Sequence, residues 1–139
     1  MAETEPLTPA DWYTRGERDM KSARALLAGG NELISTAGIF LYQGVRKYLK
    51  GYVLERNGAL RQTEELFELL AEAMLHDSNL RDFATACVLL TDFYFEHRAA
   101  VLGSAEALRT ELDPLLIEAN RLIAHLQGET GFVPPPTKS

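Results

Sequence analysis

The sequence that decides the fold runs from Thr36 to Gly58, TAGIFLYQGVRKYLKGYVLERNG. Apolar residues recur in this stretch and just before it at steps of three and four, which places them on one side of an α-helix. They are Ile34, Gly38, Leu41, Val45, Leu49 and Tyr52, and the face is widened by Phe40, Tyr48 and Val53. The pattern predicts a long helix that contacts several neighbours at the centre of the molecule.

The same stretch concentrates positive charge in an acidic chain. The 139 residues have a formal net charge of −6. Between positions 43 and 61, however, there is one acidic residue, Glu55, and there are five basic residues, which are Arg46, Lys47, Lys50, Arg56 and Arg61. Tyrosines at positions 42, 48 and 52 interleave with them. This arrangement fits either phosphate contacts beside a stacked base or a solvated outer face with tyrosines packed at its edge.

Composition limits the protein class. A chain of this length is most simply one domain, and its 46% hydrophobic and 24% charged residues are typical of a soluble globular protein. The negative net charge argues against binding nucleic acid through bulk electrostatics, although it leaves room for a local basic site. No run approaches the roughly 20 apolar residues of a membrane helix, and the first residues lack an apolar signal segment. We expect a cytoplasmic protein.

Start and stop signals divide the chain into four main helices and a possible fifth. The start signals are Thr8-Pro9 with Asp11 for the first helix, Asn31 or Ser35 for the second, Thr63 for the third, Ser78 or Asn79 for the fourth, and Asp113-Pro114 for the fifth. The stop signals are Gly29-Gly30 for the first helix, Asn57-Gly58 for the second and Gly128 for the fifth. Apolar spacing through Ala105, Leu108 and Leu112 leaves open whether residues 103–113 continue the fourth helix or form a break.

These elements predict an all-α, up-down four-helix bundle with a possible short fifth helix from Pro114 to about Gln127. Residues 1–9 would be a flexible N-terminal lead, residues 10–127 the bundle, and residues 128–139 a flexible, proline-rich tail.

No residue pattern predicts a reaction. A Glu-x-x-His pair, which a di-iron bundle would need, does not occur. His76, His97 and His125 are far apart in the sequence, and each falls near the end of a predicted helix, where a positive charge is favourable. Cys87 lies in the apolar run ATACVLL and is expected to be a small buried side chain rather than a nucleophile. We expect no catalytic residue, no metal ligand and no cofactor.

Four stretches carry a family resemblance. The first helix has Trp12 followed by Arg18-Asp19-Met20 and Ala23-x-x-Leu26-Leu27, and the second has Gln43-Gly44-Val45-Arg46-Lys47-Tyr48-Leu49-Lys50-Gly51. A later helix has Leu90-x-x-x-Tyr94-x-x-x-Arg98, and the last has Ala119 at its centre. With these features the chain, over roughly residues 10–127, resembles the HEPN domain family of prokaryotic helical bundles.

The resemblance implies a homodimer with a pocket or groove for a nucleotide, an RNA or a minimal nucleotidyltransferase partner, in a context like that of toxin–antitoxin pairs. The side chains expected to face phosphate are Arg46, Lys47, Lys50 and Arg98.

The chain departs from the nuclease members of that family. Their signature is an arginine and a histidine separated by four to six residues, with a polar residue after the arginine. Here Ala99 follows Arg98, and Arg121 and His125 have one residue too few between them. The family's tyrosine-after-histidine motif, which partner nucleotidyltransferases modify, is absent as well. The sequence favours a non-catalytic binding module, with a divergent ribonuclease or toxin and a structural homodimeric interaction protein as alternatives.

Overall fold

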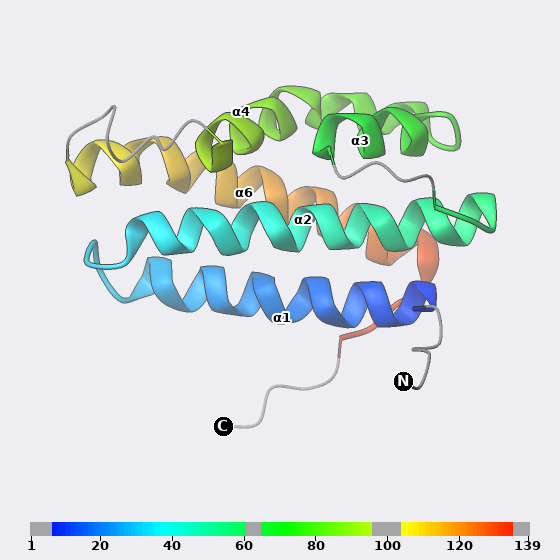
Figure 1. Ribbon diagram of the computed structural model, residues 1–139, viewed down its shortest axis with the longest axis horizontal. Helices are drawn as coiled ribbons and strands as arrows, with labels where there is room; N and C mark the ends of the chain where they lie inside the picture. The colour runs from blue at the N-terminus through cyan, green and yellow to red at the C-terminus, as the bar shows by residue number, and fades with distance from the viewer. Residues whose placement is uncertain (1–6, 61–64, 96–103, 135–139) are drawn as a thin grey trace, which may run out of the picture.

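The computed structural model describes residues 7–60, 65–95 and 104–134, within which the chain forms five α-helices and one 3-10 helix and no strand. These are α1 (Pro9–Ala28), α2 (Ile34–Asn57), α3 (Leu66–Met74), η1 (Ser78–Phe83), α4 (Ala84–Phe95) and α6 (Ala105–Thr130) (Figure 1). The predicted all-α bundle is confirmed. None of the described helices combines the length and the apolar character needed to cross a membrane.

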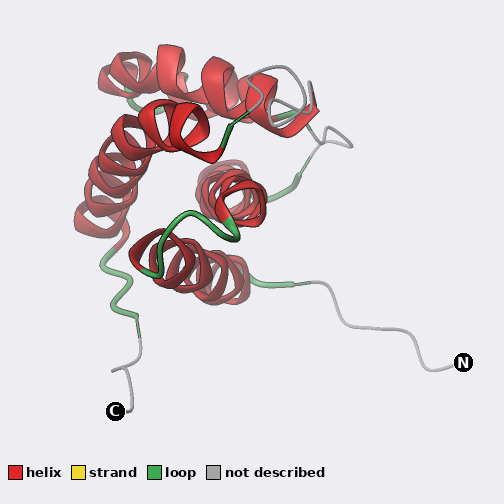
Figure 2. Ribbon diagram, turned by 90° about the vertical axis from the view of Figure 1, so that its left-hand side faces the viewer, coloured by secondary structure: helices red, strands yellow, loops and turns green. Residues whose placement is uncertain are grey.

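Helix α2 is the centre of the bundle. It contacts α1, α3, α4 and α6. When the molecule is viewed down its long axis, α2 lies above α1, below the layer of α3, η1 and α4, and beside α6 (Figure 2). All six residues of its predicted apolar stripe are buried, as are Tyr48 and Val53, while Phe40 is half-buried. The predicted central role of this helix is confirmed.

The predicted ends of α1 are also confirmed. Thr8 Oγ1 accepts a hydrogen bond from the Asp11 amide at 3.1 Å, and the Asp11 carboxylate accepts one from the Thr8 amide at 2.9 Å, which makes a reciprocal capping box. Gly29 follows the last helical residue, and Gly30 has a φ of 101°. On the inner face of this helix Tyr13 is buried, whereas Trp12 is only half-buried.

The predicted start of α2 at Asn31 or Ser35 is wrong, because the helix begins at Ile34 without a side-chain cap. The Asn31 side chain instead accepts a hydrogen bond from the Arg109 guanidinium of α6. Arg109 also donates to the carbonyl oxygens of Leu27 at 2.8 Å and Gly30 at 2.7 Å. An arginine that is distant in the sequence thus hydrogen-bonds to the polar groups of the turn between α1 and α2. The predicted stop is confirmed, since Gly58 is left-handed with a φ of 76°.

The fourth predicted helix begins as a 3-10 helix. Ser78 is its first residue, as expected, but the α-helix proper starts only at Ala84. Asp77 caps it by accepting a hydrogen bond from the Asn79 amide at 3.0 Å. The predicted cap at Thr63 lies outside the described residues.

The predicted break at Asp113-Pro114 is wrong. Helix α6 is continuous from Ala105, capped by Ser104, and Pro114 lies inside it. A proline at this position costs about 3 kcal/mol, but its side chain is exposed. The apolar stripe on the other side is unbroken, with Leu108, Leu112, Leu115, Ala119, Leu122, Ile123 and Leu126 all buried. Because burying one leucine contributes about 1.5–3 kcal/mol, packing outweighs the proline.

The same helix decides one boundary that the sequence left open and corrects another. Residues 105–112 belong to α6 rather than to a continued fourth helix. The helix also passes through Gly128, where the stop was predicted, and ends at Thr130 before a left-handed Gly131 with a φ of 74°.

Gly38 fixes the distance between α2 and α4. A Cβ atom built at this position would overlap the aromatic ring of Phe93 in α4. The ring is itself buried, so it cannot move aside without disturbing its neighbours. The absence of a side chain at Gly38 therefore lets α4 pack directly on the α2 backbone.

We expect Gly38→Ala to lower the free energy of unfolding by about 1–3 kcal/mol, because overpacking outweighs the gain in helix propensity. Gly128→Ala is the matched control. It also lies in a helix, but its added Cβ would meet only open space, so it should raise the free energy by about 0.5–1 kcal/mol. Urea unfolding of both variants measures the difference. Equal effects would contradict the close contact.

We expect Pro114→Ala to stabilise the protein by about 3 kcal/mol, because alanine restores the missing backbone donor within a continuous helix. Pro9→Ala, at the first position of α1, should leave stability unchanged or lower it, because proline is favoured there. Thermal or urea unfolding compares the two variants. The same neutral or unfavourable effect for both would instead indicate a new helix starting at Pro114.

Candidate functional site

Two pockets lined by basic side chains lie along α2. The larger, of about 400 Å³, is formed mainly by α1 and is lined by Leu7, Asp11, Thr14, Arg15, Arg18, Asp19 and Lys47. The smaller, of about 180 Å³, is lined by Tyr42, Gln43, Arg46, Tyr94 and Phe95. Lys47 and Arg46 are consecutive residues of α2, so both pockets reach the same turn of this helix. We call the surface carrying Arg15, Arg18, Arg46 and Lys47 the basic face.

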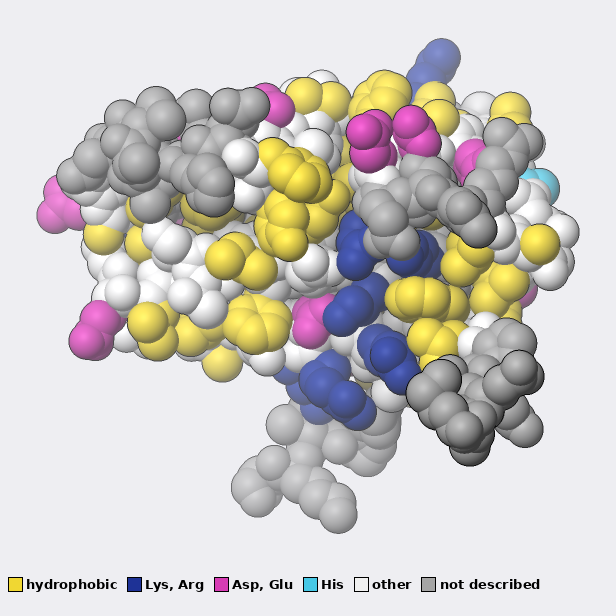
Figure 3. Space-filling model, viewed as in Figure 1, with side chains coloured by type: hydrophobic (Ala, Val, Ile, Leu, Met, Phe, Trp, Pro, Cys, Tyr) yellow, Lys and Arg dark blue, Asp and Glu magenta, His cyan; other side chains and the backbone are white. Residues whose placement is uncertain are grey.

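Positive side chains gather in the middle of the molecular surface over α2 and α1, with hydrophobic side chains on both sides (Figure 3). In the larger pocket, Lys47 Nζ lies 2.7 Å from the carboxylate of Asp19, which ties α2 to α1. Three cationic and two anionic side chains line this pocket. Its lining therefore has a small positive excess within an otherwise acidic protein.

The smaller pocket is built around a hydrogen-bonded chain from α2 to α4. Arg46 donates to the side-chain oxygen of Gln43 from Nε at 3.2 Å and from Nη2 at 2.9 Å. The Gln43 amide then donates to the Tyr94 hydroxyl at 3.1 Å, and the Tyr94 ring stacks on Tyr42 with centroids 4.2 Å apart. These contacts fix the orientation of the Arg46 guanidinium relative to α4.

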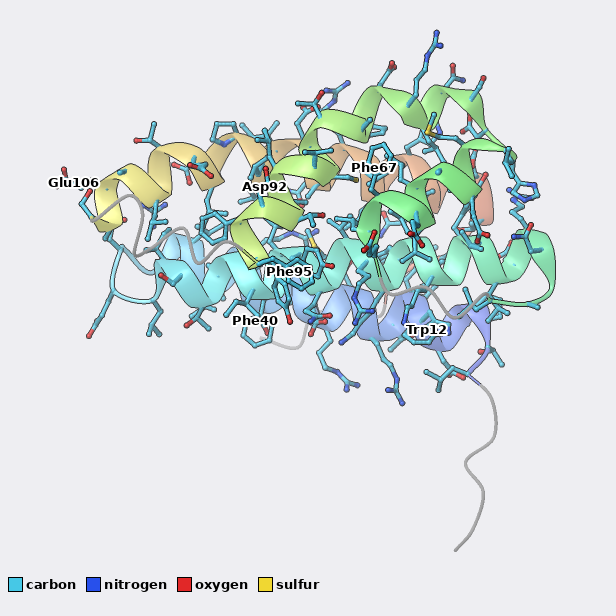
Figure 4. All side chains as sticks on the ribbon, turned by 45° about the horizontal axis from the view of Figure 1, so that its top comes forward. Trp12, Phe40, Phe67, Asp92, Phe95 and Glu106 are labelled. Carbon is cyan, nitrogen blue, oxygen red and sulfur yellow. The ribbon has the colours of Figure 1, made fainter. Side chains whose placement is uncertain are left out.

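Phe95 completes the smaller pocket. It lies at the end of α4 over α2 (Figure 4) and contacts the Tyr94 ring edge-on at a centroid distance of 4.9 Å. Its side chain is nevertheless 57% exposed. The pocket therefore combines an exposed aromatic ring, a side-chain amide and a planar cation.

The four residues predicted to face phosphate are placed differently. Arg46 and Lys47 line the two pockets, whereas Lys50 is only 7% exposed and holds its ammonium group 4.8 Å from the centre of the Trp12 ring. Such a position is typical of a cation–π contact. Arg98 lies outside the described residues.

The tyrosines interleaved with the basic residues belong to the core. Tyr42, Tyr48 and Tyr52 are all buried, which agrees with the interpretation that they pack and not with the one that they stack on a base. The exposed ring near the basic face is Phe95, which sequence reasoning missed. It also missed Arg15 and Arg18, three positions apart on α1, because spacing along one helix does not show which residues of another helix lie beside it.

A cluster of three side chains that could bind a metal ion lies elsewhere in the described residues. Asp77, His125 and Glu129 each offer a donor atom, and the three atoms lie within 4.8 Å of one another. None of the three lines either pocket of the basic face. Sequence spacing does not predict this cluster, because Asp77 is 48 positions from His125.

Side chains considered for catalysis have other partners. The Arg121 guanidinium lies 2.8 Å from the Glu118 carboxylate, and His125 Nε2 lies 2.6 Å from that of Asp77. Burial raises the pKa of the Cys87 thiol to about 12, so this cysteine carries essentially no thiolate at neutral pH. Its predicted role as a small buried side chain is confirmed.

Comparison with protein families agrees with the fold and the sequence patterns. The family model described as the HEPN domain matches residues 9–124. Comparison with curated proteins and with solved structures gave no significant match. The matched range begins at the first residue of α1 and extends into the last turns of α6. The chain therefore belongs to the HEPN domain family.

Proposed function

We propose that this protein is a non-catalytic HEPN-like binding module that holds a nucleotide or single-stranded RNA on its basic face. The observation that carries the proposal is the adjacency of a pocket lined by Arg15, Arg18 and Lys47 to a second pocket that pairs Arg46 with an exposed aromatic ring. Proteins that bind single-stranded nucleic acid commonly combine cations for phosphates with aromatic rings for bases.

The larger pocket suits phosphate groups. Arginine side chains hold phosphate oxygens through paired N–H donors, and lysine adds a compact charge. Asp11 and Asp19 lie in the same lining and oppose an anion. An entering phosphate would compete with Asp19 for Lys47, so binding should be moderate in strength and should weaken as salt increases.

The smaller pocket suits a base. Phe95 offers a face for stacking, a contact worth about 1–3 kcal/mol per base. The Gln43 amide and the Arg46 guanidinium, already oriented by their mutual hydrogen bonds, present polar groups beside that ring. Because Arg46 and Lys47 are consecutive, one ligand would reach both pockets.

Lys50 and Arg98, the other two residues predicted to face phosphate, have smaller roles in the proposed site. Lys50 would act through its charge alone, because its ammonium group is held over Trp12 behind the surface. Arg98 enters on its sequence position, four residues after Tyr94.

Exposed apolar side chains support a second candidate function, a protein-interaction module. Phe67 of α3 and Val88, Leu89 and Phe95 of α4 are all exposed, and exposed apolar patches mark interaction sites. The partner would be a second copy of this chain or a minimal nucleotidyltransferase, as the family resemblance implies. A stable dimer by sedimentation, without affinity for nucleotide or RNA, would favour this candidate over the first.

The double variant Arg18→Ala/Arg46→Ala should weaken binding of a fluorescently labelled single-stranded RNA at least tenfold, because it removes one cation from each pocket. The control is Arg81→Ala/Arg121→Ala, which changes net charge equally at exposed positions on η1 and α6. Fluorescence anisotropy measures both, and thermal shifts with ATP and GTP extend the test to free nucleotides.

Absence of binding in the wild type, or equal weakening in both double variants, would contradict the proposed basic face. Cleavage of the RNA by the wild-type protein would instead support a divergent ribonuclease.

Phe95→Ala should also weaken RNA binding, by about 1–3 kcal/mol, through the loss of stacking. Its salt dependence should match that of the wild type, because no charge is removed, whereas the double arginine variant should show a shallower dependence. Anisotropy titrations between 50 and 200 mM salt separate the two contributions. A changed salt slope for Phe95→Ala, or unchanged affinity, would remove this ring from the proposed site.

A further inference from the structure

Three potential metal ligands meet between the turn before η1 and the end of α6. Asp77 precedes η1, and His125 and Glu129 are one turn apart on α6. His125 Nε2 lies 2.6 Å from Asp77 Oδ2 and 3.6 Å from Glu129 Oε1. We propose that Asp77, His125 and Glu129 bind a divalent transition-metal ion of the Zn²⁺ class, which joins the start of η1 to the C-terminal turns of α6.

The spacing of the donor atoms fits a small coordination sphere. Zinc is bound by imidazole nitrogen and carboxylate oxygen at about 2.0–2.2 Å, which places neighbouring ligand atoms about 3–3.5 Å from each other. The three donor atoms here lie between 2.6 and 4.8 Å apart. Side-chain rotations that move the carboxylate oxygens by about 1 Å would bring all three donor atoms onto one ion.

The donor types select the class of ion. Imidazole suits zinc and its transition-metal neighbours, whereas calcium and magnesium prefer sites made entirely of oxygen. The side chains of Asp77, His125 and Glu129 are 10%, 34% and 28% exposed. An ion can therefore enter from solvent, and water can complete its coordination.

Neighbouring groups already orient the ligands. Asp77 Oδ1 accepts the Asn79 backbone N–H at 3.0 Å, which leaves Oδ2 directed toward His125. The carboxyl group of Glu129 accepts a hydrogen bond from the hydroxyl of buried Tyr52. The His125 ring lies beside Phe83, with ring centroids 6.4 Å apart. Outer contacts of this kind orient ligands and strengthen metal binding.

The local electrostatics favour a cation. Donor atoms of the Asp77 and Glu129 carboxyl groups lie within 4.8 Å of each other, beside a single imidazole. The two carboxyl groups thus crowd one another and oppose ionisation of the pair. A divalent ion between them would relieve that repulsion.

This site is separate from the basic face in both residues and chemistry. No ligand of the proposed metal lines the pockets around Arg46 and Lys47. The two proposals can therefore fail independently.

Calorimetric titration of the tag-free full chain with Zn²⁺ tests the site. We expect one ion per chain with a dissociation constant in the micromolar range or tighter, and a melting temperature that rises with zinc and returns to its starting value with EDTA. His125→Gln and Glu129→Gln should each weaken binding at least tenfold. The control His76→Gln should bind as the wild type does, because His76 pairs with Asn57 at 2.6 Å outside the cluster.

Co²⁺ provides a second measurement, since its visible absorption reports ligation of the ion. Wild-type protein should give a saturable spectrum that Glu129→Gln loses while its far-UV circular dichroism stays unchanged. Because Glu129 is partly exposed, this variant decides the question if His125→Gln fails to fold. No heat of binding at 100 µM Zn²⁺, undiminished binding by Glu129→Gln, or loss of binding in His76→Gln would each overturn the proposal.

Discussion

The close approach of other helices to the α2 backbone is the constraint on which the rest of the structure depends. Added Cβ atoms at Gly38, Gly44 and Gly51 would press on Phe93, Met20 and Tyr13, respectively. These contacts come from α4 on one side and α1 on the other. Glycine normally weakens a helix by about 1 kcal/mol, but here it allows buried side chains of two other helices to lie directly against α2. The positions of α1 and α4 relative to α2 follow from that packing.

The basic face is a consequence of the same packing. Lys47 reaches Asp19 because α1 lies close to α2, and Gln43 reaches Tyr94 because α4 does. Each contact joins a residue of α2 to a residue of a different helix. The two pockets therefore exist only when all three helices are assembled, and mutations at the glycines of α2 would disturb the pockets without touching their lining.

Local signals predicted the parts of the fold that depend on local physics. The capping box at Thr8 and the left-handed stop at Gly58 need only neighbouring residues, and the apolar stripe of α2 needs only helical periodicity. The errors arose where distant residues decide. Arg109 occupies the Asn31 side chain that was expected to cap α2, and a buried stripe on α6 keeps the helix intact across Pro114.

The same distinction applies to the candidate sites. Arg46 and Lys47 were recognisable from their spacing on one helix, whereas Arg15, Arg18 and Phe95 join them only through contacts between helices. His125 and Glu129 are four positions apart and share one face of α6, but Asp77 reaches them through the turn before η1. Sequence spacing identifies residues that share an element, and packing decides which elements meet.

A buried polar network explains why α6 keeps a fixed position beside the α1–α2 pair. Glu17 of α1 accepts hydrogen bonds from Tyr48 of α2 at 2.8 Å and from Arg24 at 3.0 Å. Gln127 of α6 donates to the Tyr48 hydroxyl at 3.1 Å. Burial and the hydrogen bond to Glu17 raise the pKa of Tyr48, which keeps the phenol protonated as the donor that Glu17 requires.

Arg24 extends this network to α6 by donating to the Asn120 side chain at 3.0 and 3.1 Å. A buried carboxylate is costly when any partner is missing. Sliding or rotating α6 would break the bonds from Arg24 to Asn120 and from Gln127 to Tyr48, and shifting α1 against α2 would separate Glu17 from Tyr48. Close packing at the glycines of α2 sets the position of α1, and this polar network adds the hydrogen bonds that fix the register of α6 against both helices.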